Sequence, residues 1–115
     1  MEEQNKVSIW LGNFKSENEL NSFMKEQFTE DGDIYSEFMK AFEIDFIDNQ
    51  FQEVFFSENL SKENLESFSY SESYLEQITT NLEKYNSVIA LYNFNYSGKI
   101  LNANDIDFIG VYDYK

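Results

Sequence analysis

Carboxylates dominate the residues of this 115-residue chain that could perform chemistry. There are 22 Asp and Glu against 8 Lys, while His, Cys and Arg are absent. These absences remove the usual general base, the thiolate nucleophile, the thiolate zinc ligand and the bidentate guanidinium clamp for phosphate. Three uses remain for the acids: binding a hard cation, hydrolysis by two carboxylates, or recognition of a partner.

The spacing of the acids gives little support to the first two uses. Asp31, Asp33 and Glu37 are clustered as calcium ligands could be, but the glycine and glutamate that an EF-hand loop requires are missing. Among 22 carboxylates, some pair will have a spacing suitable for glycoside hydrolysis by chance. We therefore predict no metal, no cofactor and no catalytic residues, with a carboxylate-based hydrolase as the weakest alternative.

The negative charge is concentrated in one segment. Residues 26–58 contain 10 acids and a single lysine, Lys40, which gives −9 of the total net charge of −14. Such a surface attracts basic proteins and repels nucleic acid and anionic membranes. The segment is either a solvated face or a surface that complements a basic cleft by imitating a phosphate backbone. Its charge exceeds what solubility requires, which favours the second interpretation.

Tyrosine is the second informative residue type, with eight copies. Tyr70 and Tyr74 alternate with serine and glutamate, a composition typical of protein interfaces. Tyr74 also belongs to an apolar helical stripe, so we predict that it is a core residue. For Tyr70, an interface position and a position at the core boundary are equally well supported.

Periodicity predicts the elements that position these residues. Apolar residues at helical spacing indicate a helix from a capping box at Ser16 to Phe28, a second over 35–42, and a third from a capping box at Ser73 to Tyr85, with one helical turn around Leu65. Alternating or continuous apolar runs indicate strands, namely residues 6–12, 88–96, 99–101 and 106–112. The aromatic and β-branched content of residues 44–56 suggests extended structure, either continuous or broken around 48–50.

These elements predict one α+β domain over residues 1–115. We expect an antiparallel sheet with a C-terminal three-strand meander and helices packed mainly on one face. Trp10 lies on the second face of its strand, which suggests that this strand is covered on both sides. No apolar run reaches the roughly 20 residues of a membrane span and no secretory signal is visible, so we expect a cytoplasmic protein that binds no membrane.

Five strings of the sequence are informative in their order and spacing, at residues 7–14, 36–42, 68–74, 86–94 and 108–111. The tryptophan–glycine strand opening and the tyrosine–serine–glutamate string are the most distinctive. Together these strings resemble immunity protein 22, a bacterial family of polymorphic toxin systems, and the resemblance extends over nearly the whole chain.

The resemblance implies an antidote that binds the toxin domain of its own producer, and many such toxins are nucleases. We therefore expect a monomer that covers the active site of a basic toxin domain and does not bind nucleic acid. The rival of another class is a non-catalytic acidic subunit of a larger assembly. The predicted contact residues are Glu30, Asp31, Asp33, Glu37, Asp45, Asp48, Glu53, Tyr70 and Glu72.

Overall fold

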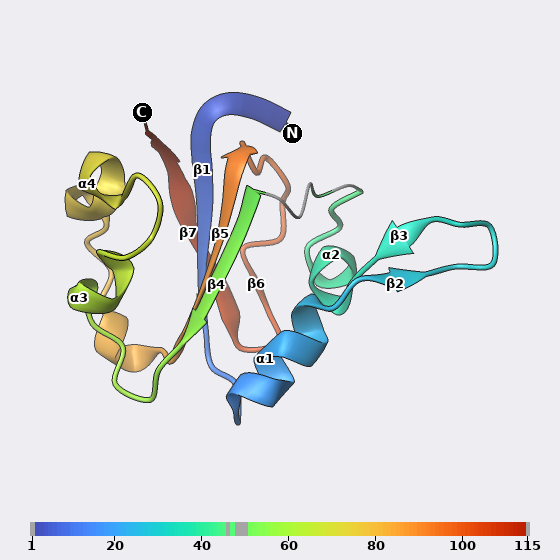
Figure 1. Cartoon of the computed structure of the whole chain (residues 1–115), viewed down its shortest axis with the longest axis horizontal. Helices are drawn as coiled ribbons and strands as arrows, with labels where there is room; N and C mark the ends of the chain where they lie inside the picture. Colours follow the sequence, from blue (N-terminus) through green and yellow to red (C-terminus); the bar gives the residue numbers. More distant parts are fainter. Residues whose placement is uncertain (1, 46, 48–50, 115) are drawn as a thin grey trace.

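An antiparallel sheet forms the centre of the fold, and short helices cover both of its faces (Figure 1). The computed structural model describes residues 2–45, 47 and 51–114, and within them five strands form this sheet in the order β4-β5-β1-β7-β6. The elements of the sheet are β1 Glu2–Gly12, β4 Gln52–Phe56, β5 Ser87–Phe94, β6 Asn102–Ala103 and β7 Ile106–Asp113. The remaining elements are α1 Glu17–Met24, β2 Gln27–Phe28, β3 Ile34–Tyr35, α2 Glu37–Ala41, α3 Lys62–Leu65, α4 Ser71–Tyr74, and the 3-10 turns η2 Leu75–Gln77 and η3 Leu82–Lys84.

The central strand β1 explains why the sheet is covered twice. Trp10 belongs to one buried cluster, whereas Ile9 and Leu11 belong to another. Because successive side chains of a strand point to opposite faces, apolar residues at consecutive positions need cover on both. The prediction from Trp10 that this strand is covered on both sides is confirmed.

The first face is an aromatic core under α1 and α2. Trp10 is fully buried, and its ring centroid lies 5.0 Å from that of Phe38, 5.3 Å from Tyr96 and 5.1 Å from Phe108. Edge-on and tilted aromatic pairs at these distances each contribute about 0.5–1.5 kcal/mol beyond the burial of their area. This face therefore positions α2 and the hairpin that precedes it.

The second face is covered by α3, α4 and the two 3-10 turns. Three of these elements contribute a buried apolar side chain to the same cluster: Leu65 from α3, Tyr74 from α4 and Leu82 from η3. Tyr74 is fully buried, which confirms its prediction as a core residue. The segment between α3 and α4 runs past the end of β5, where Tyr92 lies.

The α+β class, the antiparallel sheet and the predicted strands that correspond to β5 and β7 are confirmed. The predicted strand over 99–101 is wrong, because β6 begins only at Asn102. Two further details differ from expectation. β1 lies between β5 and β7, so the C-terminal strands are not consecutive neighbours, and only β6 and β7 form a hairpin. Helices pack on both faces and not mainly on one, because β1 and β5 are apolar on both sides.

All three predicted helices differ from those of the structure. The first begins as predicted, with the Ser16 hydroxyl accepting from the Glu19 amide at 3.2 Å, but it ends at Met24 because Lys25 is extended and Phe28 pairs in a hairpin. The predicted helix from Ser73 to Tyr85 is wrong: the chain forms α4, η2 and η3 instead, and α4 begins at Ser71. The helical turn around Leu65 is confirmed as α3, and the second predicted helix is shortened to α2.

Candidate protein-binding site

A two-stranded hairpin projects from the body of the molecule between α1 and α2 (Figure 1). We call residues 27–35 the acidic hairpin. Its loop is closed by backbone hydrogen bonds, from the Thr29 amide to the Asp33 carbonyl at 2.9 Å and from the Gly32 amide to the Thr29 carbonyl at 3.0 Å. The Thr29 hydroxyl also accepts from the Asp33 amide at 3.1 Å. Gly32 has φ 87°, a left-handed conformation that glycine adopts without strain. The loop thus has a defined shape.

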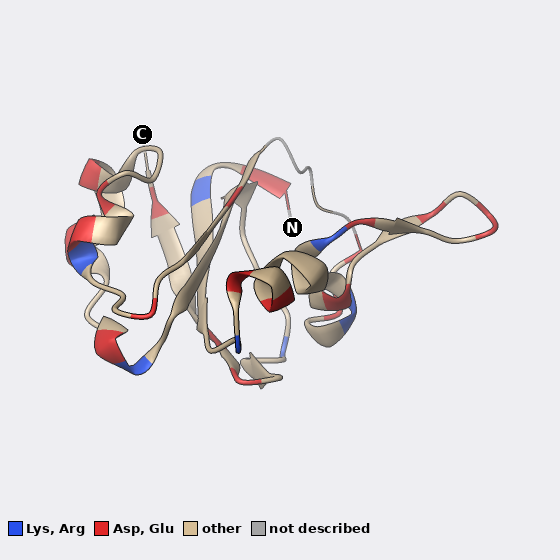
Figure 2. Ribbon diagram, turned by 60° about the horizontal axis from the view of Figure 1, so that its bottom comes forward, with Lys and Arg blue, Asp and Glu red and all other residues tan. Residues whose placement is uncertain are grey.

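The surface of the acidic hairpin combines carboxylates with exposed apolar side chains. Phe28 is 69% exposed and Ile34 is 41% exposed, and the two residues pair across the strands. The acidic residues of the loop are exposed, namely Glu30, Asp31 and Asp33. In Figure 2 the ribbon of the hairpin loop carries the red of Asp and Glu positions. Large exposed apolar residues beside charges are typical of a contact surface.

The base of the hairpin is fixed to the fold by polar and aromatic contacts. The Tyr35 hydroxyl donates to the Gln27 side chain at 3.2 Å, and the Lys40 ammonium lies 4.2 Å from the centroid of the Tyr35 ring. Ser36 then caps α2, because its hydroxyl accepts from the Met39 amide at 3.1 Å. These contacts hold the base, whereas the tip has only its own strand pairing.

A second feature is a pocket of about 300 Å³ at the end of β5. We call it the tyrosine pocket. Its lining comes from five parts of the chain, which are β1, the start of β4, the loop before α4, the end of β5 and the C-terminal residues. The lining residues are Asn5, Phe51, Glu53, Ser69, Tyr70, Tyr92, Asn93 and Tyr114.

The half-buried carboxylate of Glu53 is held in this pocket by neutral donors. Its Oε1 accepts from the Ser69 amide at 3.0 Å, and its Oε2 accepts from the Ser69 hydroxyl at 2.8 Å. The Tyr92 hydroxyl lies 3.0 Å from Glu53 Oε1 and 2.7 Å from the Ser69 carbonyl. Because a phenol has a single proton, these two acceptors share one donor.

A buried pair of phenols lies behind the carboxylate. The hydroxyl oxygens of Tyr74 and Tyr92 are 2.8 Å apart. When Tyr92 donates toward Glu53 or Ser69, Tyr74 has to donate to Tyr92. Burial raises the pKa of Tyr74 to about 12, against the effect of its hydrogen bond to Tyr92. Burial and the hydrogen bond shared with Tyr74 also raise the pKa of Tyr92. Both phenols therefore stay protonated at neutral pH, as donors near the carboxylate.

Three tyrosine rings form the aromatic wall of the pocket. The centroid of the Tyr114 ring is 4.9 Å from that of Tyr70 and 5.2 Å from that of Tyr92. Tyr70 is 50% exposed, and its backbone has φ 59° and ψ 20°, a left-handed conformation that costs a bulky residue energy. Tyr70 therefore lies at the mouth of the pocket with a backbone strained to place it there.

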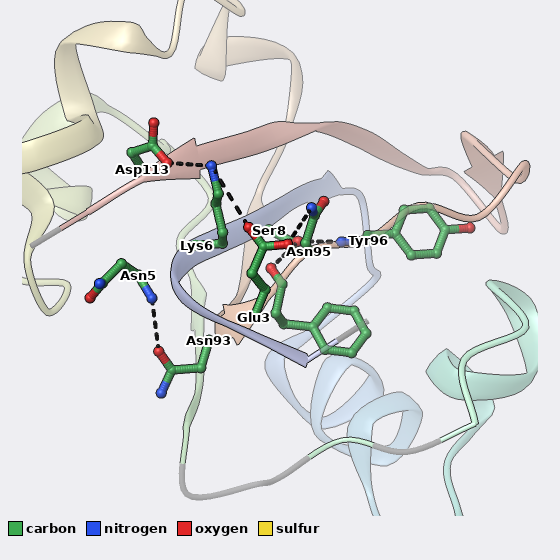
Figure 3. Close-up of polar contacts among 9 residues, drawn as sticks. Glu3, Asn5, Lys6, Ser8, Asn93, Asn95, Tyr96 and Asp113 are labelled. Carbon is green, nitrogen blue, oxygen red and sulfur yellow. Dashed lines mark hydrogen bonds and ion pairs between the residues drawn. The ribbon is translucent and has the colours of Figure 1, made fainter.

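The rim of the pocket is held where β1 curls over the ends of β5 and β7 (Figure 3). The Asn5 amide donates to the Asn93 side chain at 3.3 Å, and the Tyr114 hydroxyl donates to the same Asn93 oxygen at 2.7 Å. Nearby, the Lys6 ammonium pairs with Asp113, and the buried Ser8 hydroxyl donates to the Phe94 carbonyl at 2.7 Å. The pocket is thus built on the ends of three neighbouring strands.

The predicted contact residues fall into two groups. Glu30, Asp31 and Asp33 lie in the acidic hairpin, and Glu37 opens α2 at its base. Figures 1 and 2 place the hairpin at one end of the molecule and α3 and α4 at the other.

The second group lies around the pocket. Glu53 and Tyr70 both line the tyrosine pocket, and Glu72 is exposed on α4 without lining it. Asp45 is exposed after α2, and Asp48 lies outside the described residues. The predicted residues therefore do not form one continuous face.

Sequence reasoning missed most of the pocket lining. Tyr92 has the pattern of a buried central-strand residue, and Tyr114 lies beyond the last predicted strand. The left-handed backbone of Asn5 and Asn93, with φ 64° and 57°, is a conformation that asparagine tolerates better than most residues, but no local spacing reveals it. The one available signal was the surplus of tyrosine.

Within the described residues, no group of three or more acidic side chains is placed to hold a metal ion. None of the helices there has both the length and the apolar character that a membrane span requires.

The antiparallel sheet carries two features suited to contact with a partner, the acidic hairpin and the tyrosine pocket. A family model described as Immunity protein 22 matches residues 7–115, and the chain therefore belongs to that family. Membership indicates a toxin-neutralising role in which the protein binds a toxin partner, and immunity proteins are generally non-catalytic. No curated protein and no solved structure matches the chain.

Proposed function

We propose that this protein neutralises a basic nuclease toxin domain by binding over its active site. One copy of the protein binds one toxin domain, in the cytoplasm, where nucleic acid is the target to be protected. The family supports the toxin as partner, and the net charge of −14 supports a basic one.

The observation that carries the proposal is the shape and charge of the acidic hairpin. A cleft that binds nucleic acid is concave and positively charged, because it has to accept a phosphate backbone. The hairpin is a projection with acids in its loop and with Phe28 and Ile34 exposed on its strands. It can therefore offer carboxylates to phosphate-binding groups while its apolar residues exclude water from the contact.

The proposed contact extends from the hairpin along the acidic segment. Exposed acids at the edge of an interface act mainly on the rate of encounter, and steering can bring association to about 10⁸ M⁻¹s⁻¹ at low salt. Residues near the centre act mainly on the rate of dissociation. The acids of the proposed contact are Glu30, Asp31, Asp33, Glu37, Asp45, Asp48 and Glu53, joined by Tyr70 and Glu72.

Co-expression with the toxin encoded immediately upstream tests the function itself. We expect rescue of growth, a stable complex of one chain with one toxin domain, and loss of nucleic-acid cleavage by the isolated toxin. If the active site is covered, a polyanion such as heparin should compete with the protein for the toxin. Failure to rescue growth together with failure to co-purify at low salt contradicts the proposal.

Charge reversal tests the position of the contact. We expect the triple variant Asp31→Lys, Asp33→Lys, Asp45→Lys to slow association by about tenfold or more at low salt, since rim charges act on the on-rate. The matched control reverses three exposed acids that are not among the proposed contact residues, Glu63→Lys, Glu66→Lys and Glu83→Lys. Both triples change the net charge by the same amount, so equal slowing would place the contact away from the hairpin.

A further inference from the structure

The tyrosine pocket has the chemistry of a receptor for a single organic cation. Its wall consists of the rings of Tyr70, Tyr92 and Tyr114, with Phe51 beside them, and the Glu53 carboxylate lies within it. Aromatic faces attract cations through their quadrupole, and a carboxylate adds a charge-assisted hydrogen bond. A volume of about 300 Å³ is at the small end for ligand sites, which suits one side chain better than an extended ligand.

No lysine of the described residues forms an ion pair with the carboxylate in this pocket. Among the described residues, the ion pairs found join Lys6 to Glu3 and Asp113, and none includes Glu53. A carboxylate offers about four acceptor sites. Ser69 fills two, Tyr92 shares its proton with the Ser69 carbonyl, and one site on Oε2 has no donor in the described part of the chain. A donor entering the pocket would complete this set.

Backbone strain is concentrated around the same cavity. Non-glycine residues with positive φ are rare, and three of those in the described chain, Asn5, Tyr70 and Asn93, line this pocket. Such conformations persist where the surrounding structure enforces them, and they cluster at ligand sites. The strain at Tyr70 does not serve core packing, because half of this residue is exposed to solvent.

We propose that the tyrosine pocket receives an arginine or lysine side chain of the toxin domain. The side chain lies with the Tyr70 and Tyr114 rings on one side and the Glu53 carboxylate on the other. This inference rests on the proposed toxin-neutralising function, because the basic toxin supplies the cation. A side chain of the partner accounts for an aromatic residue at the mouth, a carboxylate inside and a cavity too small for a longer ligand. The pocket is then an anchor that slows dissociation, separate from the acidic hairpin.

The first experiment tests the pocket without the toxin. N-acetyl-arginine methylamide is titrated at millimolar concentration while the ring resonances of Tyr70 and Tyr114 are followed by NMR, with the neutral citrulline analogue as control. We expect shifts with the arginine probe only, and their loss in Glu53→Gln. Glu72→Gln is the matched control, because Glu72 is an exposed neighbour that does not line the pocket. No shift, or an equal shift with citrulline, overturns the proposal.

The second experiment uses the complex with the toxin. We expect Glu53→Gln and Tyr70→Ala each to accelerate dissociation by about tenfold, the scale of an anchor residue, and Tyr70→Phe to retain wild-type dissociation because the ring is kept. This inference is overturned if the pocket variants dissociate at the wild-type rate while the hairpin triple variant still slows association. The proposed function is not affected by that result. If the arginine probe binds but the protein forms no complex with the toxin, the proposed function is overturned, and so is the proposal that a toxin side chain occupies the pocket. The pocket would then be assigned to a free organic cation.

Discussion

The acidic hairpin and the tyrosine pocket differ in how the rest of the protein supports them. The hairpin tip is held by its own strand pairing and loop bonds, and its apolar residues Phe28 and Ile34 face solvent. The pocket is built on a buried pair of phenols, Tyr74 and Tyr92, and on a half-buried carboxylate with several donors. We therefore expect substitutions in the hairpin tip to cost little folding stability, and substitutions behind the pocket to cost much more.

This difference suggests a division of work in binding. Charges on a projecting loop act at a distance and speed the encounter with a basic surface, but they fix little geometry. A supported cavity acts only on contact, because its rings and carboxylate have to surround a group to bind it. Affinity for the toxin would then combine fast association through the hairpin with slow dissociation through the pocket.

The largest expected contrast between the regions is in stability. Tyr74→Ala removes a fully buried ring behind the pocket and should lower the free energy of unfolding by about 3–5 kcal/mol, as other large-to-small core changes do. Phe28→Ala in the hairpin should change it by no more than about 0.5 kcal/mol, because the side chain is 69% exposed. Chemical denaturation of both variants measures the two values. Similar losses would mean that the hairpin is part of the cooperative fold.

High pH should weaken the pocket side specifically. Tyrosine in the unfolded chain titrates near its ordinary pKa of 10, whereas Tyr74 in the folded protein has a pKa of about 12. Between these values the folded state binds a proton that the unfolded state has lost, so the free energy of unfolding falls as pH rises. Two pKa units correspond to about 2–3 kcal/mol, and below pH 10 this contribution is constant.

Denaturation curves from pH 8 to 12 check this expectation. Tyr74→Phe removes the titrating group and should show a shallower fall of the free energy of unfolding above pH 10. Phe28→Ala keeps every phenol and should follow the slope of the wild type. A fall that is equally steep in Tyr74→Phe would assign the alkaline loss to other groups, such as Tyr85, whose hydrogen bond to Asp107 raises its pKa to about 12.

The elements with strong local signals could be predicted from the sequence. The alternation in β1 and the apolar run in β5 identified strands, and the Ser16–Glu19 capping box identified the start of α1. The long helix after Ser73 was wrong for a physical reason. Tyr74, Ile78 and Leu82 have helical spacing, yet Ile78 is extended, and separate short turns bring the three side chains to the same face of the sheet.

The candidate site was predictable only where it is local. The acids of the hairpin are close together in sequence, so their charge could be recognised from the sequence alone. The pocket joins Asn5, Glu53, Tyr70, Tyr92 and Tyr114 through strand order, and β1 takes its place between β5 and β7 by long-range pairing that no local pattern contains. Glu53 and Tyr70 were both predicted as contact residues, but their common pocket was not.

The prediction with the smallest expected effect separates the contribution of the pocket's hydroxyl groups from that of its buried rings. Tyr92→Phe keeps the ring but removes the hydroxyl that lies between Tyr74, Glu53 and Ser69, leaving buried polar groups without a partner. This should lower the free energy of unfolding by about 1–2 kcal/mol. Tyr35→Phe at the hairpin base removes one hydrogen bond of 3.2 Å from a half-buried hydroxyl and should cost no more than about 0.5 kcal/mol. Urea denaturation measures both effects. Equal losses would show that the hydroxyl network contributes no more to the stability of the pocket than a surface hydrogen bond contributes to the hairpin. The difference in stability between the two regions would then come from apolar burial alone.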